Sequence, residues 1–181
     1  MSHPRVILLT GPKFSGKSLF VEGLLSSLRE KGLRVAGFVQ RGVFDAEGRK
    51  VGYDLVGLVS GSCRPLARLS DAGHGWLFDD AAFGAALSEL GESADLTVID
   101  ELGPLELAGK GHARALDLAL GSSRAVLVVV REELAGDAER LLAARAAVTV
   151  VRFEPGQDSE IAATVSGILA MEEALPNRPI P

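Results

Sequence analysis

The chain has 181 residues, of which 47% are hydrophobic and 24% are charged, with a net charge of −5. Its length suits one domain, and its apolar content excludes a disordered chain. The acidic balance gives no indication of a nucleic-acid or membrane surface, and no apolar run approaches the roughly 20 residues of a membrane span. We expect a cytoplasmic protein in which residues 1–175 form a single domain and residues 176–181 an extended tail.

The hydrophobic pattern alternates between strand-like and helical segments. Short aliphatic runs predict strands at Arg5–Thr10, Arg34–Gln40, Val51–Ser60, Leu96–Asp100, Ala125–Val130 and Val148–Phe153. Apolar residues at helical spacing predict helices at Lys17–Lys31, Asp80–Leu90, Gly111–Leu120, Leu134–Arg145 and Ser159–Glu173. This order favours an α/β fold with a mostly parallel sheet and helices on both faces.

Two stretches interrupt the alternation. The segment Asp45–Gly48 has the composition of a hairpin turn, which predicts an antiparallel excursion after the second strand instead of a helical crossover. The segment Gly61–Gly75 is rich in glycine, serine and arginine, and we expect it to be a loop system.

The segment Gly11–Ser18 reads GPKFSGKS and matches the pattern G-x-x-x-x-G-K-[ST]. It lies between a predicted aliphatic strand and a predicted amphipathic helix, which is the context of a phosphate-binding loop. Backbone N–H groups of such a loop and of the helix N-terminus bind phosphate oxygens. The predicted nucleotide-binding residues are Gly11, Pro12, Lys13, Phe14, Ser15, Gly16, Lys17, Ser18 and Leu19.

Two residues of this loop carry specific chemistry. The Lys17 ammonium can reach the β- and γ-phosphates, and the Ser18 hydroxyl can bind Mg²⁺. The alternative is an ordinary glycine-rich turn with an exposed lysine.

A second candidate feature is the acidic pair Asp100–Glu101, at the end of a predicted aliphatic strand. In phosphoryl-transfer sites an Asp at a strand end holds the Mg²⁺ ion, here together with Ser18. Glu101 can polarise the attacking water as a general base. Because adjacent strand residues point in different directions, we expect the two carboxylates to take separate roles. The alternative is a plain acidic strand end.

Three arginines are candidates for stabilising phosphate charge. Arg64 and Arg68 lie in the predicted loop system, and Arg131 directly follows a predicted strand. Strand ends of this kind form the ligand-binding edge of open α/β sheets. Solvated surface arginines are the alternative for the first two.

Several other residues favour ordinary roles. We expect Glu106 to order the turn that follows the acidic pair, and Trp76 and Phe78 to pack in the core. His74, between two glycines, is a loop residue rather than a base, and Cys63 has no partner that would make it a nucleophile.

These blocks together resemble the small P-loop nucleoside triphosphatases known as cancer-related nucleoside triphosphatases and their archaeal and bacterial relatives. The likeness spans roughly residues 5–153. Besides the phosphate loop, the blocks that carry it are Val35–Phe38, Arg49–Val56, Pro65–Arg68 and Ile99–Leu107. The resemblance implies a RecA-like P-loop fold and slow, weakly selective, Mg²⁺-dependent hydrolysis of nucleoside triphosphates to diphosphates.

The chain departs from the family pattern at two places. Pro104 stands where the family usually has a lysine, and Val39–Gln40 stands where it has a polar pair. If that lysine assists catalysis, its replacement predicts still slower turnover.

The leading hypothesis is therefore a nucleoside triphosphatase. No Asn/Thr-Lys-x-Asp motif is present, so we expect broad use of ATP, GTP and other triphosphates. One alternative is a small-molecule kinase, in which an acceptor replaces water. Another is a nucleotide-binding adapter with negligible turnover that captures a protein partner.

Overall fold

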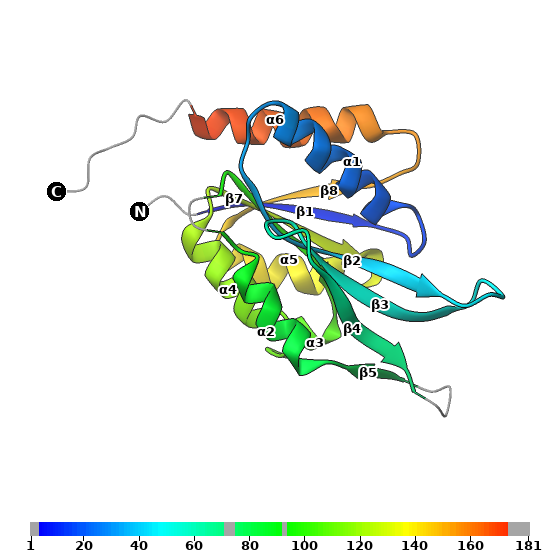
Figure 1. The fold of residues 1–181 in the computed structure, drawn as a ribbon. Helices are drawn as coiled ribbons and strands as arrows, with labels where there is room; N and C mark the ends of the chain where they lie inside the picture. The colour runs from blue at the N-terminus through cyan, green and yellow to red at the C-terminus, as the bar shows by residue number, and fades with distance from the viewer. Residues whose placement is uncertain (1–3, 71–74, 92–93, 174–181) are drawn as a thin grey trace.

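The computed structural model describes residues 4–70, 75–91 and 94–173, and within them one eight-stranded sheet runs through the molecule (Figure 1). The predicted tail at 176–181 and His74 lie outside the described residues. The strands are β1 (Arg5–Gly11), β2 (Val35–Phe44), β3 (Lys50–Gly57), β4 (Cys63–Leu69), β5 (Trp76–Phe78), β6 (Leu96–Leu102), β7 (Ala125–Arg131) and β8 (Ala147–Arg152). The helices are α1 (Lys17–Glu30), α2 (Asp80–Ser88), α3 (Pro104–Leu107), α4 (Ala113–Ser122), α5 (Ala135–Ala143) and α6 (Asp158–Glu173), with a 3₁₀ turn at Glu132–Leu134.

The strand order is β5-β4-β3-β2-β6-β7-β1-β8. Strands β2, β6, β7, β1 and β8 pair in parallel, whereas β3, β4 and β5 extend the sheet antiparallel. The predicted α/β architecture with a mostly parallel sheet is confirmed.

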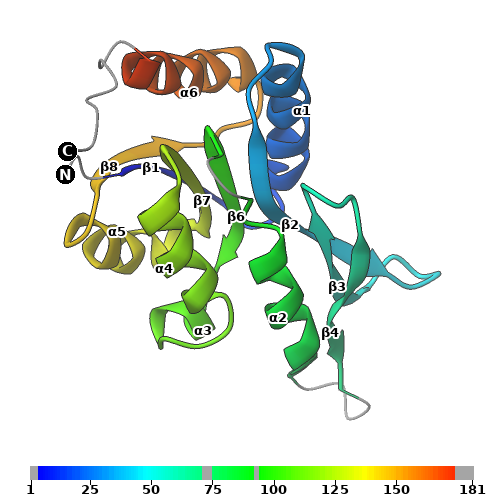
Figure 2. The same cartoon turned by 60° about the vertical axis from the view of Figure 1, so that its left-hand side comes forward.

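Helices cover both faces of the sheet. Helices α1 and α6 lie on one face, and α2, α4 and α5 lie on the other (Figures 1 and 2). The middle of β1, Val6–Leu9, is aliphatic because both of its faces are covered: Val6 and Leu8 pack toward α4 and α5, while Ile7 and Leu9 pack toward α1 and α6. A strand segment buried on both faces favours a continuous aliphatic run. None of the helices among the described residues is long and apolar enough to cross a membrane.

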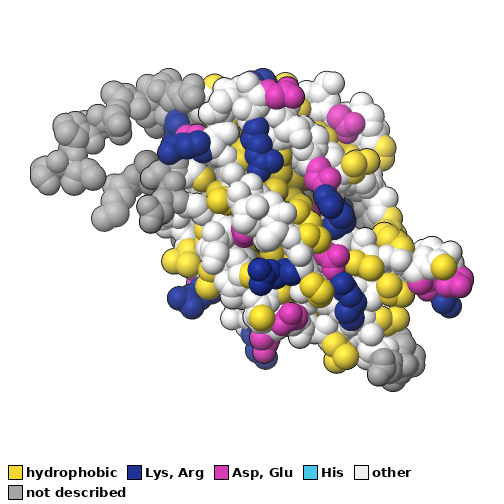
Figure 3. All heavy atoms as spheres, viewed as in Figure 1, with side chains coloured by type: hydrophobic (Ala, Val, Ile, Leu, Met, Phe, Trp, Pro, Cys, Tyr) yellow, Lys and Arg dark blue, Asp and Glu magenta, His cyan; other side chains and the backbone are white. Residues whose placement is uncertain are grey.

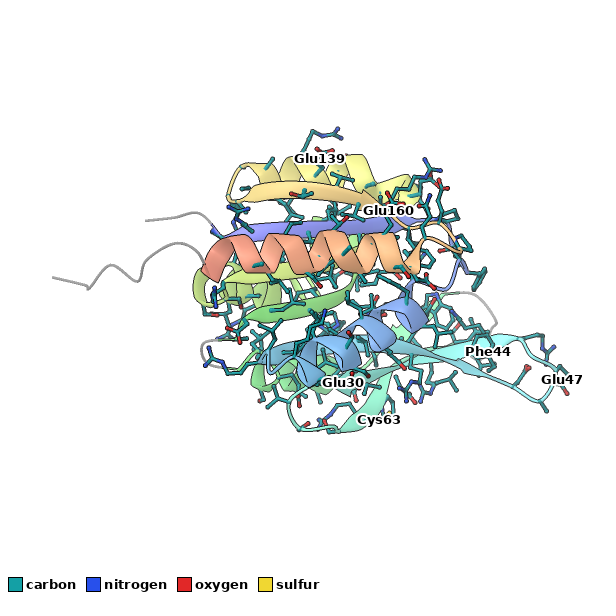
Figure 4. All side chains as sticks on the ribbon, turned by 90° about the horizontal axis from the view of Figure 1, so that it is seen from above. Glu30, Phe44, Glu47, Cys63, Glu139 and Glu160 are labelled. Carbon is teal, nitrogen blue, oxygen red and sulfur yellow. The ribbon has the colours of Figure 1, made fainter. Side chains whose placement is uncertain are left out.

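The predicted hairpin is confirmed. Strand β2 continues directly into β3 through a turn in which the Gly48 N–H donates to the Asp45 carbonyl at 3.0 Å. The Asp45 carboxylate accepts from the Arg49 N–H at 2.8 Å, so one side chain closes the turn. Figure 4 shows Glu47 at the hairpin tip, beyond the body of the molecule.

The predicted loop at Gly61–Gly75 is wrong. Within it, Cys63–Leu69 forms β4, which pairs with β3. Directly after it, Trp76–Phe78 forms the edge strand β5, which pairs with β4. Only Leu66 and Ala67 of β4 are buried, so the segment owes its order to the hydrogen bonds of β3 and not to an apolar pattern. The expectation that the two aromatics of β5 lie in the core is also wrong, because Trp76 is 36% exposed and Phe78 is 45% exposed.

Glycine at position 37 is required by the packing of β2 against β6. Its φ is +99°, and a Cβ there would lie 2.0 Å from the Val98 carbonyl oxygen. We therefore predict that Gly37→Ala lowers the free energy of unfolding by about 2 kcal/mol or more. Gly84→Ala, in the open on α2, is the control and is expected to raise it by about 0.5–1 kcal/mol. Urea denaturation measures both, and equal stabilities of the two variants would contradict the prediction.

Candidate active site

The loop between β1 and α1 contains two residues with positive φ. Phe14 and Gly16 have positive φ values of 62° and 95°, which turn the chain sharply before the helix. Helix α1 begins directly after Gly16, and no side chain of the described residues caps its first turn. The first N–H groups of the helix therefore have no side-chain partner and face the loop's concave side, where the helix dipole favours negative charge.

Lys17 folds back into this loop. Its ammonium donates to the carbonyl oxygens of Gly11 at 2.8 Å and Pro12 at 2.7 Å, and the side chain is almost fully buried. Burial lowers the pKa of Lys17, while the nearby Glu101 and Asp100 carboxylates act in the opposite direction. The lysine is thus a buried cation that is held by neutral carbonyls close to two acidic side chains.

Asp100 lies opposite the loop at the end of β6 and is 1% exposed. Its carboxylate accepts from the Gln40 N–H at 3.4 Å and from the Ser18 hydroxyl. Burial, together with the charge of Glu101, raises the pKa of Asp100 to about 7. The structure therefore brings the predicted metal-binding pair, Ser18 and Asp100, into direct contact.

Glu101 faces the same cavity as Asp100. Between them and β7 the pairing shifts, because Asp100 pairs with Val129 and Leu102 with the next residue, Val130. The peptide bond between Asp100 and Glu101 is cis. A bulge places one extra residue against its partner strand, so adjacent side chains no longer alternate between faces. Both carboxylates line one cavity, where Asp100 contacts Ser18 and Glu101 contacts Arg131. Separate roles for the two stay a prediction.

Arg131, at the end of β7, pairs with Glu101 through its Nε at 2.5 Å. Burial raises the pKa of Glu101, and the charge of Arg131 opposes that shift. Arg131 also hydrogen-bonds Tyr53, so it is held from two sides. Of the three candidate arginines, this is the one that the structure brings to the acidic pair.

The other two arginines lie elsewhere, on β4. Arg64 is exposed, and neither it nor Arg68 lines the cavity. Arg68 is paired with the Asp54 carboxylate at 2.6 Å and donates to the Tyr53 carbonyl at 2.8 Å, so its side chain links β4 to β3.

These side chains enclose a cavity of about 420 Å³ at the carboxyl ends of β1, β6 and β7. The predicted binding residues from Lys13 to Leu19 line it, together with the acidic pair. Its charged groups are Lys13, Lys17, Lys50, Arg41, Arg131, Glu22, Asp100 and Glu101. Cations exceed anions, so the cavity suits a polyanionic ligand.

Sequence reasoning missed the residues that the hairpin contributes to this cavity. Lys50, on β3, lies 5.0 Å from the Phe14 ring and 4.7 Å from the Tyr53 ring. Burial and the charge of Lys13 lower its pKa. Three of the five lysines of the chain line the cavity, but Lys50 is distant from the loop in sequence, and only the fold of the hairpin brings it there.

Glu106 has the structural role predicted for it. Its carboxylate accepts from the Gly103 N–H and from the His112 N–H, each at 2.8 Å. These bonds order the turn that leads from the acidic pair into α3.

A glycine-rich loop and helix N-terminus that face strand-end carboxylates are typical of α/β proteins that bind nucleotides. Comparison with known proteins agrees. The family model described as NTPase matches residues 6–164, and the chain belongs to this family. The resemblance seen in the sequence is therefore confirmed.

Named relatives specify the activity. The nucleoside-triphosphatase THEP1 of Caldivirga maquilingensis is 30% identical over 128 residues, which cover 68% of this chain and 73% of that protein. THEP1 of Hyperthermus butylicus is 33% identical over 136 residues, covering 71% and 72%. The crystal structure of THEP1 from Aquifex aeolicus matches the fold with a TM-score of 0.66 at 17% identity, over 91% of this chain and 98% of that one. The chain is thus an enzyme that hydrolyses nucleoside triphosphates.

The burial of Asp100 predicts a stability effect that depends on pH. The pKa rises from 3.8 in the unfolded chain to about 7 in the folded one, so between these values the folded state binds more protons. The free energy of unfolding therefore falls as pH rises through this window. Asp100→Asn removes the cost of ionising a buried carboxylate. Without nucleotide or Mg²⁺, we expect the free energy of unfolding of this variant to exceed that of the wild type by roughly 4 kcal/mol at most at pH 8, and to match it near pH 4.

Asp95→Asn is the matched control for this measurement. Asp95 is buried but pairs with Arg34 and Arg124, and hydrogen bonds from Arg34 outweigh burial and lower its pKa. Its ionised form is stabilising above pH 4, so Asp95→Asn is expected to be less stable than the wild type at pH 8. Urea denaturation across pH 4–8 tests both variants. If Asp100→Asn, like Asp95→Asn, is less stable than the wild type at pH 8, the raised pKa of Asp100 is contradicted.

Proposed function

We propose that the Gly11–Ser18 segment is a phosphate-binding P-loop in a RecA-like fold and that the γ-phosphoryl group of its nucleotide passes to water. The observation that carries the proposal is the convergence of Lys17, Ser18, Asp100 and Glu101 on one cavity. The loop N–H groups and the Lys17 ammonium would bind the β- and γ-phosphates. Lys17 would exchange its two carbonyl partners for phosphate oxygens.

The residues present fit a magnesium ion. Mg²⁺ is held in nucleotide sites by one or two protein oxygen ligands together with phosphate oxygens, and Ser18 and Asp100 supply such oxygens side by side. A divalent cation would also offset the cost of ionising the buried Asp100. When bound, it neutralises charge on the phosphates.

Glu101 would act on the attacking water. The water oxygen forms a bond to the γ-phosphorus, the bond from that phosphorus to the β–γ bridging oxygen breaks, and Glu101 accepts the proton of the water. Arg131 favours the ionised state of Glu101 and adds positive charge near the γ-phosphate. We propose slow turnover, because the ion pair with Arg131 weakens Glu101 as a base and because Pro104 replaces the lysine of the family pattern.

A groove of about 500 Å³ beside α1 and the start of α6 would receive the ribose and base. It shares Ser15, Gly16 and Leu19 with the first cavity, and Phe20 supplies apolar surface on which any base can pack. We therefore propose broad base specificity. A nucleic-acid partner is not favoured, because acidic and basic side chains are intermixed on the face seen in Figure 3. A single domain and a cytoplasmic location remain predictions from the sequence.

Glu101→Gln tests the base role. We expect it to lower phosphate release by about 10² or more while nucleotide binding is retained. Glu22→Gln is the matched control, because Glu22 lines the same cavity but pairs with Arg41 at 3.0 Å on its outer side. Its rate should stay within roughly threefold of the wild type, as expected for an exposed ion pair. A Glu101→Gln rate near that of the wild type would remove Glu101 from the mechanism.

The same assay separates the alternatives. Diphosphate and inorganic phosphate formed without an added acceptor support hydrolysis, whereas product that depends on an acceptor supports a kinase. Tight nucleotide binding with no product supports an adapter that captures a protein partner.

Base specificity is measured with ATP, GTP, CTP and UTP under one condition. The kcat/KM values should agree within about tenfold, since apolar packing discriminates weakly between bases. A preference of roughly 100-fold for one base would contradict the proposed role of the groove.

A further inference from the structure

A second cavity of about 290 Å³ adjoins the nucleotide cavity on the side of β4, β5 and α2. The two cavities share Gln40, Tyr53, Glu101 and Arg131. We call the second cavity the aromatic chamber, because its apolar wall is formed by Tyr53, Leu66, Trp76, Phe78 and Phe83. A molecule inside it can therefore contact Glu101 and Arg131, which also line the nucleotide cavity.

His112 lines this chamber and is 1% exposed. Its ring packs against Phe38 at 4.3 Å and Phe83 at 4.7 Å between centroids. Neither ring nitrogen has a hydrogen-bond partner among the described residues. Burial lowers the pKa of His112 to about 4, so at neutral pH the ring offers one donor and one acceptor.

The unpaired ring distinguishes His112 from its neighbours. Glu106 uses both carboxylate oxygens, one of them to bind the His112 backbone N–H, so the position of the residue is already secured without its side chain. Leaving a buried polar group unpaired is costly, and a hydrophobic ring or leucine would fill the same space without that cost. A polar atom of a ligand in the chamber would supply the partner that the imidazole lacks.

The chamber's lining defines what that ligand is. Flat rings pack well on the faces and edges of Trp76, Phe78 and Phe83. The chamber volume of about 290 Å³ lies just below the usual range of small-molecule sites, about 300–1,000 Å³, which suits one or two fused rings. Polar side chains also line the chamber: His112 and Glu106, and, at the junction with the nucleotide cavity, Gln40, Tyr53, Glu101 and Arg131. The Glu106 carboxylate is already bonded to two backbone N–H groups.

We propose that the aromatic chamber binds a small aromatic molecule of one or two rings, whose polar edge pairs with His112 and whose other edge lies against Glu101 and Arg131. The occupant displaces the water that Glu101 orients, so it lowers phosphate release without competing with nucleotide. This effect on hydrolysis rests on the proposed function; binding to the chamber does not.

Indole and quinoline serve as probes, since one carries a ring N–H donor and the other a ring nitrogen acceptor. Saturation-transfer NMR on the full chain should show at least one of them binding the wild type. In His112→Leu the affinity should fall at least fivefold, while the unfolding midpoint stays equal to that of the wild type or rises, because an unpaired buried polar group has been removed. Phosphate release without probe should be unchanged in this variant.

Two further variants complete the test. Trp76→Ala removes a partly exposed side chain from the wall of the chamber, so we expect the variant to fold. It should also weaken the binding of the probe. Leu118→Ala removes an exposed leucine of α4 outside the chamber and should leave binding unchanged, which controls for non-specific apolar contact. With saturating MgATP, the bound probe should reduce phosphate release at least twofold in the wild type and in Leu118→Ala.

Three results would overturn the proposal. The chamber is excluded as the site if neither indole nor quinoline binds the wild type, or if a probe binds the wild type, His112→Leu and Trp76→Ala equally. A His112→Leu variant that is less stable than the wild type shows that the histidine is structural. Probe binding without loss of phosphate release excludes displacement of the water. If the wild type releases no phosphate from any triphosphate, the proposed function fails, and the NMR measurements still decide the chamber.

Discussion

The burial of two adjacent carboxylates is the constraint on which the rest of the site depends. Asp100 and Glu101 lie at the end of a central strand, and burial raises the pKa of both. Ionised carboxylates in such a place are costly unless cations approach them. Lys17, on α1, and Arg131, on β7, lie near the two carboxylates. With the other charged residues of the cavity, cations exceed anions. In the proposed function, a triphosphate with a divalent cation would complete this charge distribution.

The parallel sheet supplies the rigid part of this arrangement. Strands β1, β6 and β7 end at one edge, so the loop, the acidic pair and Arg131 meet there although they are far apart in the sequence. The antiparallel hairpin β2–β3 extends past that edge. Its side chains, among them Gln40 and Lys50, form a further wall of the cavity. The cavity is thus formed partly by the ends of the parallel strands and partly by the β2–β3 hairpin.

Glu101 stands at the junction of two cavities. One is lined by cations and by the glycine-rich loop, and the other by aromatic rings and the unpaired His112. A polar group kept unpaired in a core lowers stability, and proteins retain such groups mainly where function requires them. Under the two proposals, the chemistry at Glu101 would respond to an occupant of either cavity.

The local pattern of the sequence was sufficient for the parallel strands, for the hairpin turn at Asp45–Gly48 and for the phosphate-loop motif. These features depend on neighbours in the chain: aliphatic runs, turn residues and a loop of fixed spacing. Strand β4 could not be predicted, because its order comes from pairing with β3. Only the tertiary structure decided the register shift between Asp100 and Leu102, the separation of Arg68 from the site, the position of Lys50 and the existence of the aromatic chamber. Each depends on a shift in strand register or on contacts between distant segments, and periodicity along one chain carries no information about either.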